Sequence, residues 1–448
     1  MSYKVGMVSL GCAKNRVDAE NLLYRLREKG YILCEDPAMS DAAVVNTCGF
    51  IESAKQESID EILELAALKK EGKIKALVVT GCLAERYREL IRQEIPEVDA
   101  VVSIGSNAEI ADAVEAALNG EKKEFFSDKM NFPMEGGRIQ STEPYCAYLK
   151  IAEGCDNRCS YCAIPLIRGG FRSRKMENII DEAARLAENG VKELLVIAQD
   201  TTRYGEDLYG EPKLAELLTK LCRIDGFKWI RVLYCYPDRI TDELIDVIAK
   251  EDKIVKYIDL PLQHCSENIL KAMNRRGNRE SLSALINKIR ARIPEVVLRT
   301  TMITGFPDET EEDFCELAEF AKELRFERLG CFAYSQEENT PAAEFENQID
   351  EDVKNRRAQI IMEQQEEIME EYAQSLVGKT VEVLVEGYDR YAECFFSRSR
   401  ADAPEVDGSV FFTAEKGAVH PGDFVKVRIT ETVGCDPVGE LIVGEDEK

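Results

Sequence analysis

The sequence predicts an α/β protein with three parts: an N-terminal open parallel sheet, a central partial β/α barrel and a small C-terminal antiparallel β-barrel. Three observations predict this order. Short β-branched runs alternate with helical patterns over residues 1–125. The alternation resumes over residues 146–377, after a linker at 126–145 that contains Pro and Gly. From residue 378 to 448, short strand patterns are separated by Gly, Pro and Asp.

Size and composition describe a globular protein. The chain has 448 residues, of which 45% are hydrophobic and 32% charged, which is enough for about three domains. No apolar run is long enough for a bilayer, and the first residues show no signal-peptide pattern, so we expect a cytoplasmic protein without a membrane partner. In that compartment the 15 cysteines favour metal binding, catalysis or plain burial over disulfides.

In the first part, three predicted strands each lead into a cysteine beside a glycine. Residues 5–10, 43–46 and 76–80 are the strands, and Cys12, Cys48 and Cys82 follow them. Because parallel strands present their carboxyl ends on one edge of a sheet, we expect these cysteines to converge. For a single cysteine, plain core burial would be the better interpretation. Three at the same place in successive βα units favour a shared site.

The second part repeats the βα unit six times, which predicts a partial β/α barrel with its chemistry at the carboxyl ends of the strands. The expected strands are residues 147–152, 193–198, 230–234, 257–260, 298–303 and 329–334. Polar or conformationally special residues follow several of them. Candidates for a cofactor pocket there are Gln199, Asp200, Gln263, Gly305 and Phe306, although a solvated loop position is the ordinary alternative for each.

The loop after the first barrel strand contains Cys155, Cys159 and Cys162 in the run EGCDNRCSYCAIP. Thiolates at this spacing can hold three irons of a [4Fe-4S] cubane and leave the fourth iron open. A zinc site would require a fourth Cys or His nearby, and the only histidines are His264 and His420. The spacing therefore favours an iron-sulfur cluster over structural zinc or three unrelated buried thiols.

An open iron can chelate S-adenosylmethionine through its amino and carboxylate groups. One-electron reduction then breaks a C–S bond and yields a 5′-deoxyadenosyl radical, chemistry that the cofactor carries and the protein positions. Tyr161 lies inside the motif and either shields the cluster, packs on the adenine or serves as a core aromatic. Arg172 and Arg174 are candidates for the cofactor carboxylate or the substrate, with a solvated loop role as the alternative.

The last part begins with a helix predicted over residues 353–375, whose apolar spacing indicates packing against the barrel. Strands follow at residues 380–385, 410–413, 424–429 and 440–443, which predicts a small OB-like barrel.

The C-x-x-x-C-x-x-C motif at the end of a first barrel strand resembles the radical S-adenosylmethionine superfamily. Together with the preceding trio, Cys12, Cys48 and Cys82, and the β-barrel behind, nearly the whole chain resembles the methylthiotransferases of that superfamily, whose terminal barrel is a TRAM domain. The resemblance implies that the trio holds a second [4Fe-4S] cluster with an open iron, which serves in sulfur delivery and accepts a methyl group. It also implies that two molecules of S-adenosylmethionine are consumed, one for the methyl group and one for the radical.

Within this family, several stretches are similar to the enzymes that modify an aspartate of small-subunit ribosomal protein twelve. The tRNA-modifying enzymes usually have Gln-Met-Asn after the first cysteine, where this chain has Ala-Lys-Asn. Ala13, Ala19 and Asn339 depart from the ribosomal-protein group, and none is a proposed ligand. The similar stretches are residues 9–20, 148–165, 168–174, 198–205, 257–264 and 400–408.

The charge of the chain and of its last part indicates which kind of substrate it binds. The chain carries a net charge of −26, and residues 378–448 hold 8 Lys and Arg against 15 Asp and Glu. A barrel that grips tRNA should be basic, whereas an acidic one suits a basic ribosomal protein, although acidity also simply aids solubility. We therefore expect a methylthiotransferase acting on the β-carbon of an aspartate in ribosomal protein twelve. A tRNA methylthiotransferase and a non-enzymatic iron-sulfur or zinc-binding protein are the alternatives. An electron donor such as flavodoxin or ferredoxin and a sulfur donor are the implied partners.

Overall fold

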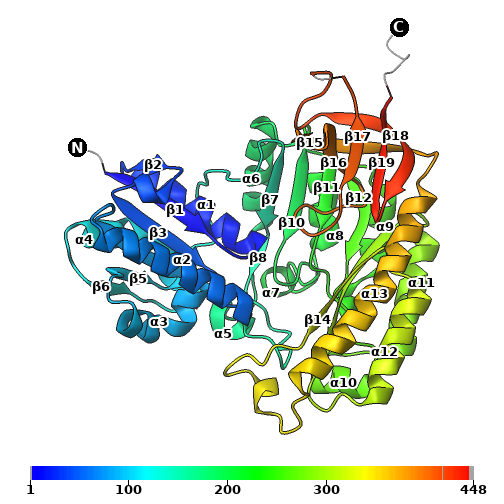
Figure 1. Ribbon diagram of the computed structural model, residues 1–448, viewed down its shortest axis with the longest axis horizontal. Coiled ribbons are helices and arrows are strands. Elements are labelled where there is room, and N and C mark those ends of the chain that lie inside the picture. Colours follow the sequence, from blue (N-terminus) through cyan, green and yellow to red (C-terminus); the bar gives the residue numbers. More distant parts are fainter. Residues whose placement is uncertain (1–2, 416, 443–448) are drawn as a thin grey trace.

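The computed structural model describes residues 3–415 and 417–442 and contains three units side by side (Figure 1). A parallel sheet with its helices forms the N-terminal unit, a half-barrel forms the centre, and a closed β-barrel lies beyond it. The predicted fold class is confirmed. Among the described helices, none combines the length and the apolarity that crossing a membrane requires.

The N-terminal sheet has six strands in the order β2-β1-β3-β4-β5-β6, all parallel. Strands β3 and β4 are buried along their whole length, which explains their continuous apolar sequence. Helices α1 and α4 pack on one face and α2 and α3 on the other. The elements are β1 Lys4–Ser9, α1 Ala13–Glu28, β2 Ile32–Cys34, β3 Ala42–Thr47, α2 Glu52–Lys70, β4 Ala76–Gly81, α3 Cys82–Glu94, β5 Ala100–Val102, α4 Ile110–Leu118 and β6 Lys123–Phe125.

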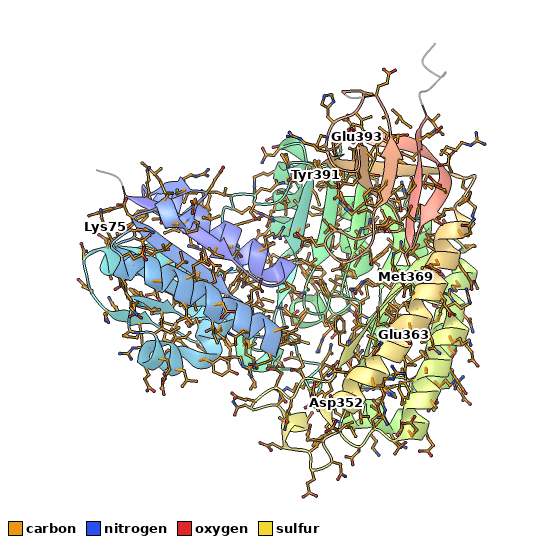
Figure 2. All side chains as sticks on the ribbon, in the orientation of Figure 1. Lys75, Asp352, Glu363, Met369, Tyr391 and Glu393 are labelled. Carbon is orange, nitrogen blue, oxygen red and sulfur yellow. The ribbon has the colours of Figure 1, made fainter. Side chains whose placement is uncertain are left out.

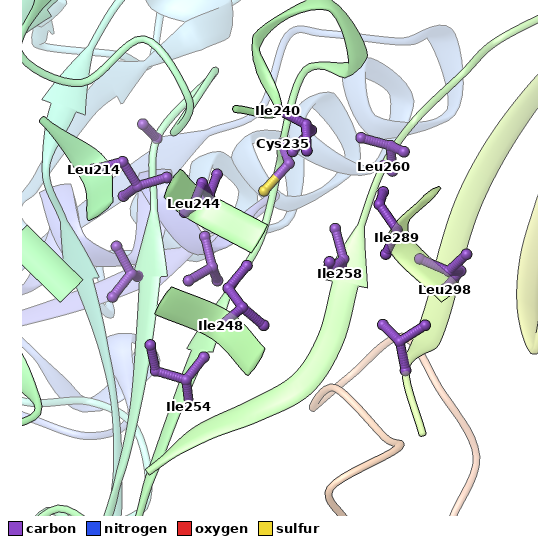
Figure 3. Close-up of a cluster of buried hydrophobic side chains, with 14 of the residues drawn as sticks. Leu214, Cys235, Ile240, Leu244, Ile248, Ile254, Ile258, Leu260, Ile289 and Leu298 are labelled. Carbon is purple, nitrogen blue, oxygen red and sulfur yellow. The ribbon is translucent and has the colours of Figure 1, made fainter. Parts of the chain in front are cut away.

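The central unit is an open barrel of six parallel strands in the order β14-β13-β12-β11-β10-β7. Apolar side chains between the strands and the outer helices form its main core, part of which Figure 3 shows around Leu244, Ile258 and Leu298. The strands are β7 Cys146–Lys150, β10 Glu193–Ile197, β11 Trp229–Val232, β12 Ile254–Asp259, β13 Val297–Thr304 and β14 Arg328–Ala333, with a small hairpin of β8 Ala152–Glu153 and β9 Arg172–Ser173. The helices are α5 Ile164–Arg168, α6 Met176–Glu188, α7 Glu206–Tyr209, α8 Leu214–Leu221, α9 Asp242–Lys250, α10 Glu267–Ala272, α11 Arg279–Arg292 and α12 Glu311–Leu324.

Helix α13, Glu351–Ser375, leads out of the half-barrel and packs on β14 and α12, as predicted. Ile361 and Ile368 are buried on its inner face, and Gln365 donates a hydrogen bond to the Phe326 carbonyl at 2.9 Å. Figure 2 shows this helix in front of α11 and α12, with Glu363 labelled on it.

The terminal barrel closes in the order β15-β16-β17-β19-β18 around an apolar core. Its pairings are antiparallel except for β17 with β19, and this parallel contact closes the ring. The sequence pattern did not predict β16, and the last expected strand begins four residues earlier, while Val443 lies outside the described residues. The strands are β15 Thr380–Asp389, β16 Cys394–Ser399, β17 Val410–Thr413, β18 Phe424–Val433 and β19 Asp436–Leu441.

The lumen of the half-barrel is filled by the two other units. Ala13 and Val17 of α1 and Ala401 and Ala403 of the terminal barrel belong to one buried apolar cluster with inward-facing strand residues. The segment 400–408 also bonds to strand side chains. Its partners are polar: Tyr257 donates to Asp407 at 2.7 Å, Tyr148 donates to Glu405 at 3.2 Å and Arg328 pairs with Asp402 at 2.6 Å.

A buried carboxylate holds the terminal barrel on the half-barrel. Glu193 of β10 accepts from Arg231 of β11 at 3.0 Å and from Arg398 of β16 at 2.6 Å, and all three side chains are buried. Two guanidinium groups around one carboxylate compensate the cost of burying the charges. Burial would raise the pKa of Glu193, but Arg398 and Arg231 together hold that pKa below its ordinary value.

We predict that Glu193→Gln destabilises the protein by about 3–5 kcal/mol at neutral pH, because the buried Arg231 loses its carboxylate and Arg398 keeps only Glu386. A lowered pKa means that the carboxylate stabilises the fold above its ordinary pKa and that this stability is lost as pH falls through the lowered value. The variant should therefore lose less stability on acidification than the wild type. Thermal and urea unfolding at pH 7 and below pH 4.5 would measure both effects.

Glu363→Gln on the exposed side of α13 is the control and should unfold with the wild type (Figure 2). Identical unfolding of the Glu193 variant and the wild type at every pH would contradict this account of the interface.

Candidate functional site: two cysteine triads

The first triad lies at the carboxyl ends of three neighbouring strands. Cys12 precedes α1 after β1, Cys48 follows β3, and Cys82 is the first residue of α3 after β4. A methyl group on Gly11 would lie 2.9 Å from Sγ of Cys48, and one on Gly49 would lie 2.9 Å from the carbonyl carbon of Cys82. Gly11 therefore packs on the side chain of Cys48 and Gly49 on the backbone of Cys82, so the loops that carry the three cysteines lie together, as the sequence predicted.

The second triad lies on the loop that follows β8. The Cys155 amide donates to the Gly169 carbonyl at 3.1 Å, and the Cys162 amide donates to the Cys159 carbonyl at 3.0 Å. The Ser160 amide donates to the carbonyl of Met273 at 3.0 Å, which ties the loop to the segment after α10. These bonds hold the loop at its start, its middle and its end.

Cations adjoin a cysteine of each triad. Arg168 donates to Sγ of Cys82 at 3.4 Å, and Arg275 donates to Sγ of Cys159 at 3.6 Å. Burial raises the pKa of Cys82 and that of Cys155 to about 11, so these thiols stay protonated until a positive group displaces the proton. Buried thiols beside fixed cations are suited to ligate an iron-sulfur cluster, whose ligands are thiolates.

Within residues 3–415 and 417–442, no three Cys, His, Asp or Glu side chains have the spacing of a single-ion site. The fit of a cluster to each triad therefore rests on its donor set of three thiols and on the neighbouring cation.

A buried ion network joins the two triads. The Arg168 guanidinium contacts Cys82, pairs with Asp18 of α1, and donates to Glu153 of β8 at 3.3 Å. Lys150 of β7 also pairs with both Asp18 and Glu153, and its Nζ lies 2.8 Å from the Glu153 carboxylate. The four charged side chains are at most 2% exposed. The strand that leads into the second triad is thus fixed to the helices that carry the first.

Helix α1 also reaches the mouth of the half-barrel. Nζ of Lys14 lies 3.2 Å from the centre of the Tyr234 ring, which follows β11. Lys14 and Asp18 are one helical turn apart on a face that also buries Ala13 and Val17. The sequence analysis missed these roles. The available signal was a pair of oppositely charged residues at i and i+4, each directly after an apolar residue of the helix.

The predicted pocket residues have different surroundings. Gln199 donates to Glu153 at 2.8 Å, and its own Oε1 is buried without a hydrogen-bond partner among the described residues. Asp200 accepts from Asn157 at 2.7 Å and so holds the cysteine loop. Gln263, four residues after the end of β12, has φ of 73°, and its amide donates to the Thr301 carbonyl at 2.8 Å.

Tyr161 is half-buried in an apolar cluster that includes Phe306, and Cys159 raises its pKa in addition to burial. Phe306 is fully buried, with its ring 5.3 Å from that of Tyr334, so its side chain packs in the core. Gly305 has φ of +69°, and a methyl group there would lie 2.1 Å from Cγ of Lys354. That position therefore requires glycine for conformation and for space.

The two arginines after the loop are engaged by the protein. Arg174 pairs at 2.7 Å with Glu135 and with Glu182. Arg172 donates to the Gly170 carbonyl at 3.0 Å, and burial lowers its pKa. Neither is a solvated loop residue, and these contacts fix the segment beside the cysteines.

Three family descriptions match the chain in succession. Residues 4–103 match the uncharacterized protein family UPF0004, residues 149–321 the radical SAM superfamily and residues 377–442 the TRAM domain. The half-barrel, its cysteine loop and these matches define a radical S-adenosylmethionine enzyme.

Relatives specify the family further. The ribosomal protein uS12 methylthiotransferase RimO of Clostridioides difficile (strain 630) is 50% identical over 98% of this chain and 99% of its own. The protein of that name from Lachnoclostridium phytofermentans is also 50% identical, over 97% of this chain and 99% of its own. The chain belongs to the RimO family of methylthiotransferases.

Solved structures share the fold at low identity. The radical S-adenosylmethionine methyltransferase TsrM from Kitasatospora setae superposes with a TM-score of 0.58 and 14% identity, over 76% of this chain and 77% of that one. The cobalamin-dependent radical enzyme OxsB gives a TM-score of 0.50 and 13% identity, over 81% of this chain and 56% of its own.

We predict that Arg168→Met destabilises the protein by about 3–5 kcal/mol, because Asp18 and Glu153 lose one of their two buried cations and keep only Lys150. Arg292→Met is a matched control, since Arg292 also contacts two carboxylates, Asp242 and Asp246, but on the surface. It should cost less than about 1 kcal/mol. Urea unfolding of the two variants measures the difference, and equal losses would contradict the assigned role of the network.

Proposed function

We propose that the protein transfers a methylthio group to the β-carbon of an aspartate in ribosomal protein uS12. The observation that carries this proposal is the pair of cysteine triads joined through Arg168, in a chain related over its full length to proteins named for this activity. The reaction takes place in the cytoplasm, where the ribosomal protein is made and assembled.

Cys155, Cys159 and Cys162 hold the cluster that binds S-adenosylmethionine, and Cys12, Cys48 and Cys82 hold a second [4Fe-4S] cluster. When bound, these groups supply radical generation and sulfur transfer. A one-electron donor such as flavodoxin or ferredoxin and a sulfur donor complete the reaction.

Residues of this chain bind and orient the reacting groups and keep water away from them. The unpartnered Oε1 of Gln199 is an acceptor available to an amino group of a bound cofactor. Lys14 against Tyr234, with Ala13 and Val17 in the lumen, keeps the end of α1 and its cysteine at the barrel mouth. The apolar filling below the mouth keeps water from reaching the reacting groups from the opposite end of the barrel.

The terminal barrel supports a protein substrate over tRNA. Residues 378–448 are acidic, and an acidic surface repels phosphates but attracts a basic ribosomal protein. The segment 400–408, which resembles the ribosomal-protein group, is used for docking the barrel: Asp402 and Asp407 are buried against the strands. The resemblance of this segment to the ribosomal-protein group therefore indicates that the units are arranged alike in that group. It does not indicate that the segment contacts the substrate.

We predict that the reconstituted enzyme, with reductant and S-adenosylmethionine under anaerobic conditions, adds one methylthio group to the aspartate of uS12. Intact-mass and fragment analysis of the ribosomal protein measures this. Parallel reactions with tRNA provide the comparison. Methylthioadenosine in tRNA with unmodified uS12 would overturn the assigned substrate, and no cleavage of S-adenosylmethionine would overturn the assigned enzyme class.

We predict that Cys12→Ala removes about half of the bound iron, because it dismantles one of two cubanes, and that Cys155→Ala removes the other half. Cys315→Ala, at an exposed cysteine outside both triads, is the control and should keep the full content. Iron and sulfide analysis of the three variants measures this. Unchanged iron in the Cys12 variant would contradict the second cluster.

A further inference from the structure

A basic cavity lies directly against the second cysteine loop. Its volume is about 420 Å³, and it is formed by the loop itself and by the segments that follow β10, β11 and α10. Its charged lining consists of five cations against two carboxylates. These are Arg203, Arg239, Lys271, Arg275 and Arg276 against Asp156 and Asp238.

The charge of this cavity is opposite in sign to that of the whole chain. The chain has a net charge of −26, yet here positive side chains exceed negative ones. Lys271 and Arg276 are exposed, and neither forms an ion pair with any residue that the structure describes. Arg203 and Arg239 share the single carboxylate of Glu206. The cavity therefore has positive charge available for an anionic partner.

Two side chains that line the cavity also contact a proposed cluster ligand. Arg275 lines it and donates to Sγ of Cys159 at 3.6 Å, and Tyr236 also lines it, with its hydroxyl 4.0 Å from the same sulfur. Asn274, another lining residue, donates to the carbonyls of Asn157 and Arg158 in the loop. A partner seated in the cavity would thus lie close to the second triad, across a short wall of side chains.

We propose that this cavity and its rim are the docking site for an acidic one-electron carrier protein. The proposal rests on the proposed function only in taking the second triad as the site of the cluster. The step is a transfer of one electron: the reduced carrier is oxidised by one electron and the cluster is reduced by one, with no proton or group transferred. Complementary charge would orient the carrier with its redox centre toward Cys159.

The proposed substrate does not fit this cavity. A basic ribosomal protein would be repelled by Lys271 and Arg276, whereas an acidic carrier would be attracted by them. The phosphates of an RNA would also be attracted, so calorimetric binding of tRNA to the wild type and the variant is measured beside that of the carrier.

The test uses the reconstituted enzyme and a flavodoxin reduced to its hydroquinone. The double substitution Lys271→Glu with Arg276→Glu should raise the dissociation constant of flavodoxin, measured by calorimetry, by about tenfold or more at low salt. The difference should shrink as ionic strength rises. Stopped-flow absorbance should show cluster reduction by flavodoxin slowed to a similar extent, and reduction by dithionite, which needs no docking, at the wild-type rate.

Arg390→Glu is the matched control, because Arg390 is an exposed cation of the terminal barrel with no ion pair in the described chain. It should leave flavodoxin binding unchanged. Wild-type flavodoxin affinity in the double variant would overturn the proposal, as would an equal loss of dithionite reduction or a loss of RNA binding alone. Binding of flavodoxin in the calorimeter does not require a cluster in the enzyme. If the second triad held no cluster, the visible absorbance of the cluster would be absent, and this result is separate from flavodoxin binding.

Discussion

One buried guanidinium connects the segments that carry the two cysteine triads. Arg168 lies with a thiol of the first triad on one side and carboxylates from α1 and β8 on the other. A buried charge is tolerated only when its partners are in place, so the network is satisfied only in the docked arrangement. Because those partners come from two units, the requirement to neutralise Arg168 is also a requirement on how the units dock.

The same physical arrangement recurs at other junctions. Glu193 lies between arginines of the half-barrel and the terminal barrel, and Glu337, after β14, lies between Lys55 and Arg86 of the N-terminal unit at 3.2 and 3.0 Å. Each is a nearly inaccessible carboxylate between cations from different elements. Apolar contacts tolerate small shifts, whereas such bonds specify one geometry, which suits a protein whose sites must meet across unit boundaries.

Local patterns were enough to predict β1, β3 and β4, the six strands of the half-barrel, the convergence of Cys12, Cys48 and Cys82, and the packing of α13, whereas the short strands β2, β5 and β6 were not predicted. These features depend on hydrophobic period and on the common direction of parallel strands. The ion networks were not predictable, because Asp18 and Arg168 are 150 residues apart and nothing local pairs them. Strand β16 was missed because its polar residues, such as Arg398, are paired across a unit boundary and so lack an apolar pattern.

The docking of segment 400–408 in the half-barrel lumen fixes the distance between the terminal barrel and the cysteine triads. The terminal barrel is held by buried bonds of the Asp402 and Asp407 side chains and by a bond of the exposed Glu405, so its outer surface keeps a set separation from the cysteine triads. Anything bound to that surface would be held at one distance from the barrel mouth, because the terminal barrel cannot turn relative to the half-barrel without breaking these bonds.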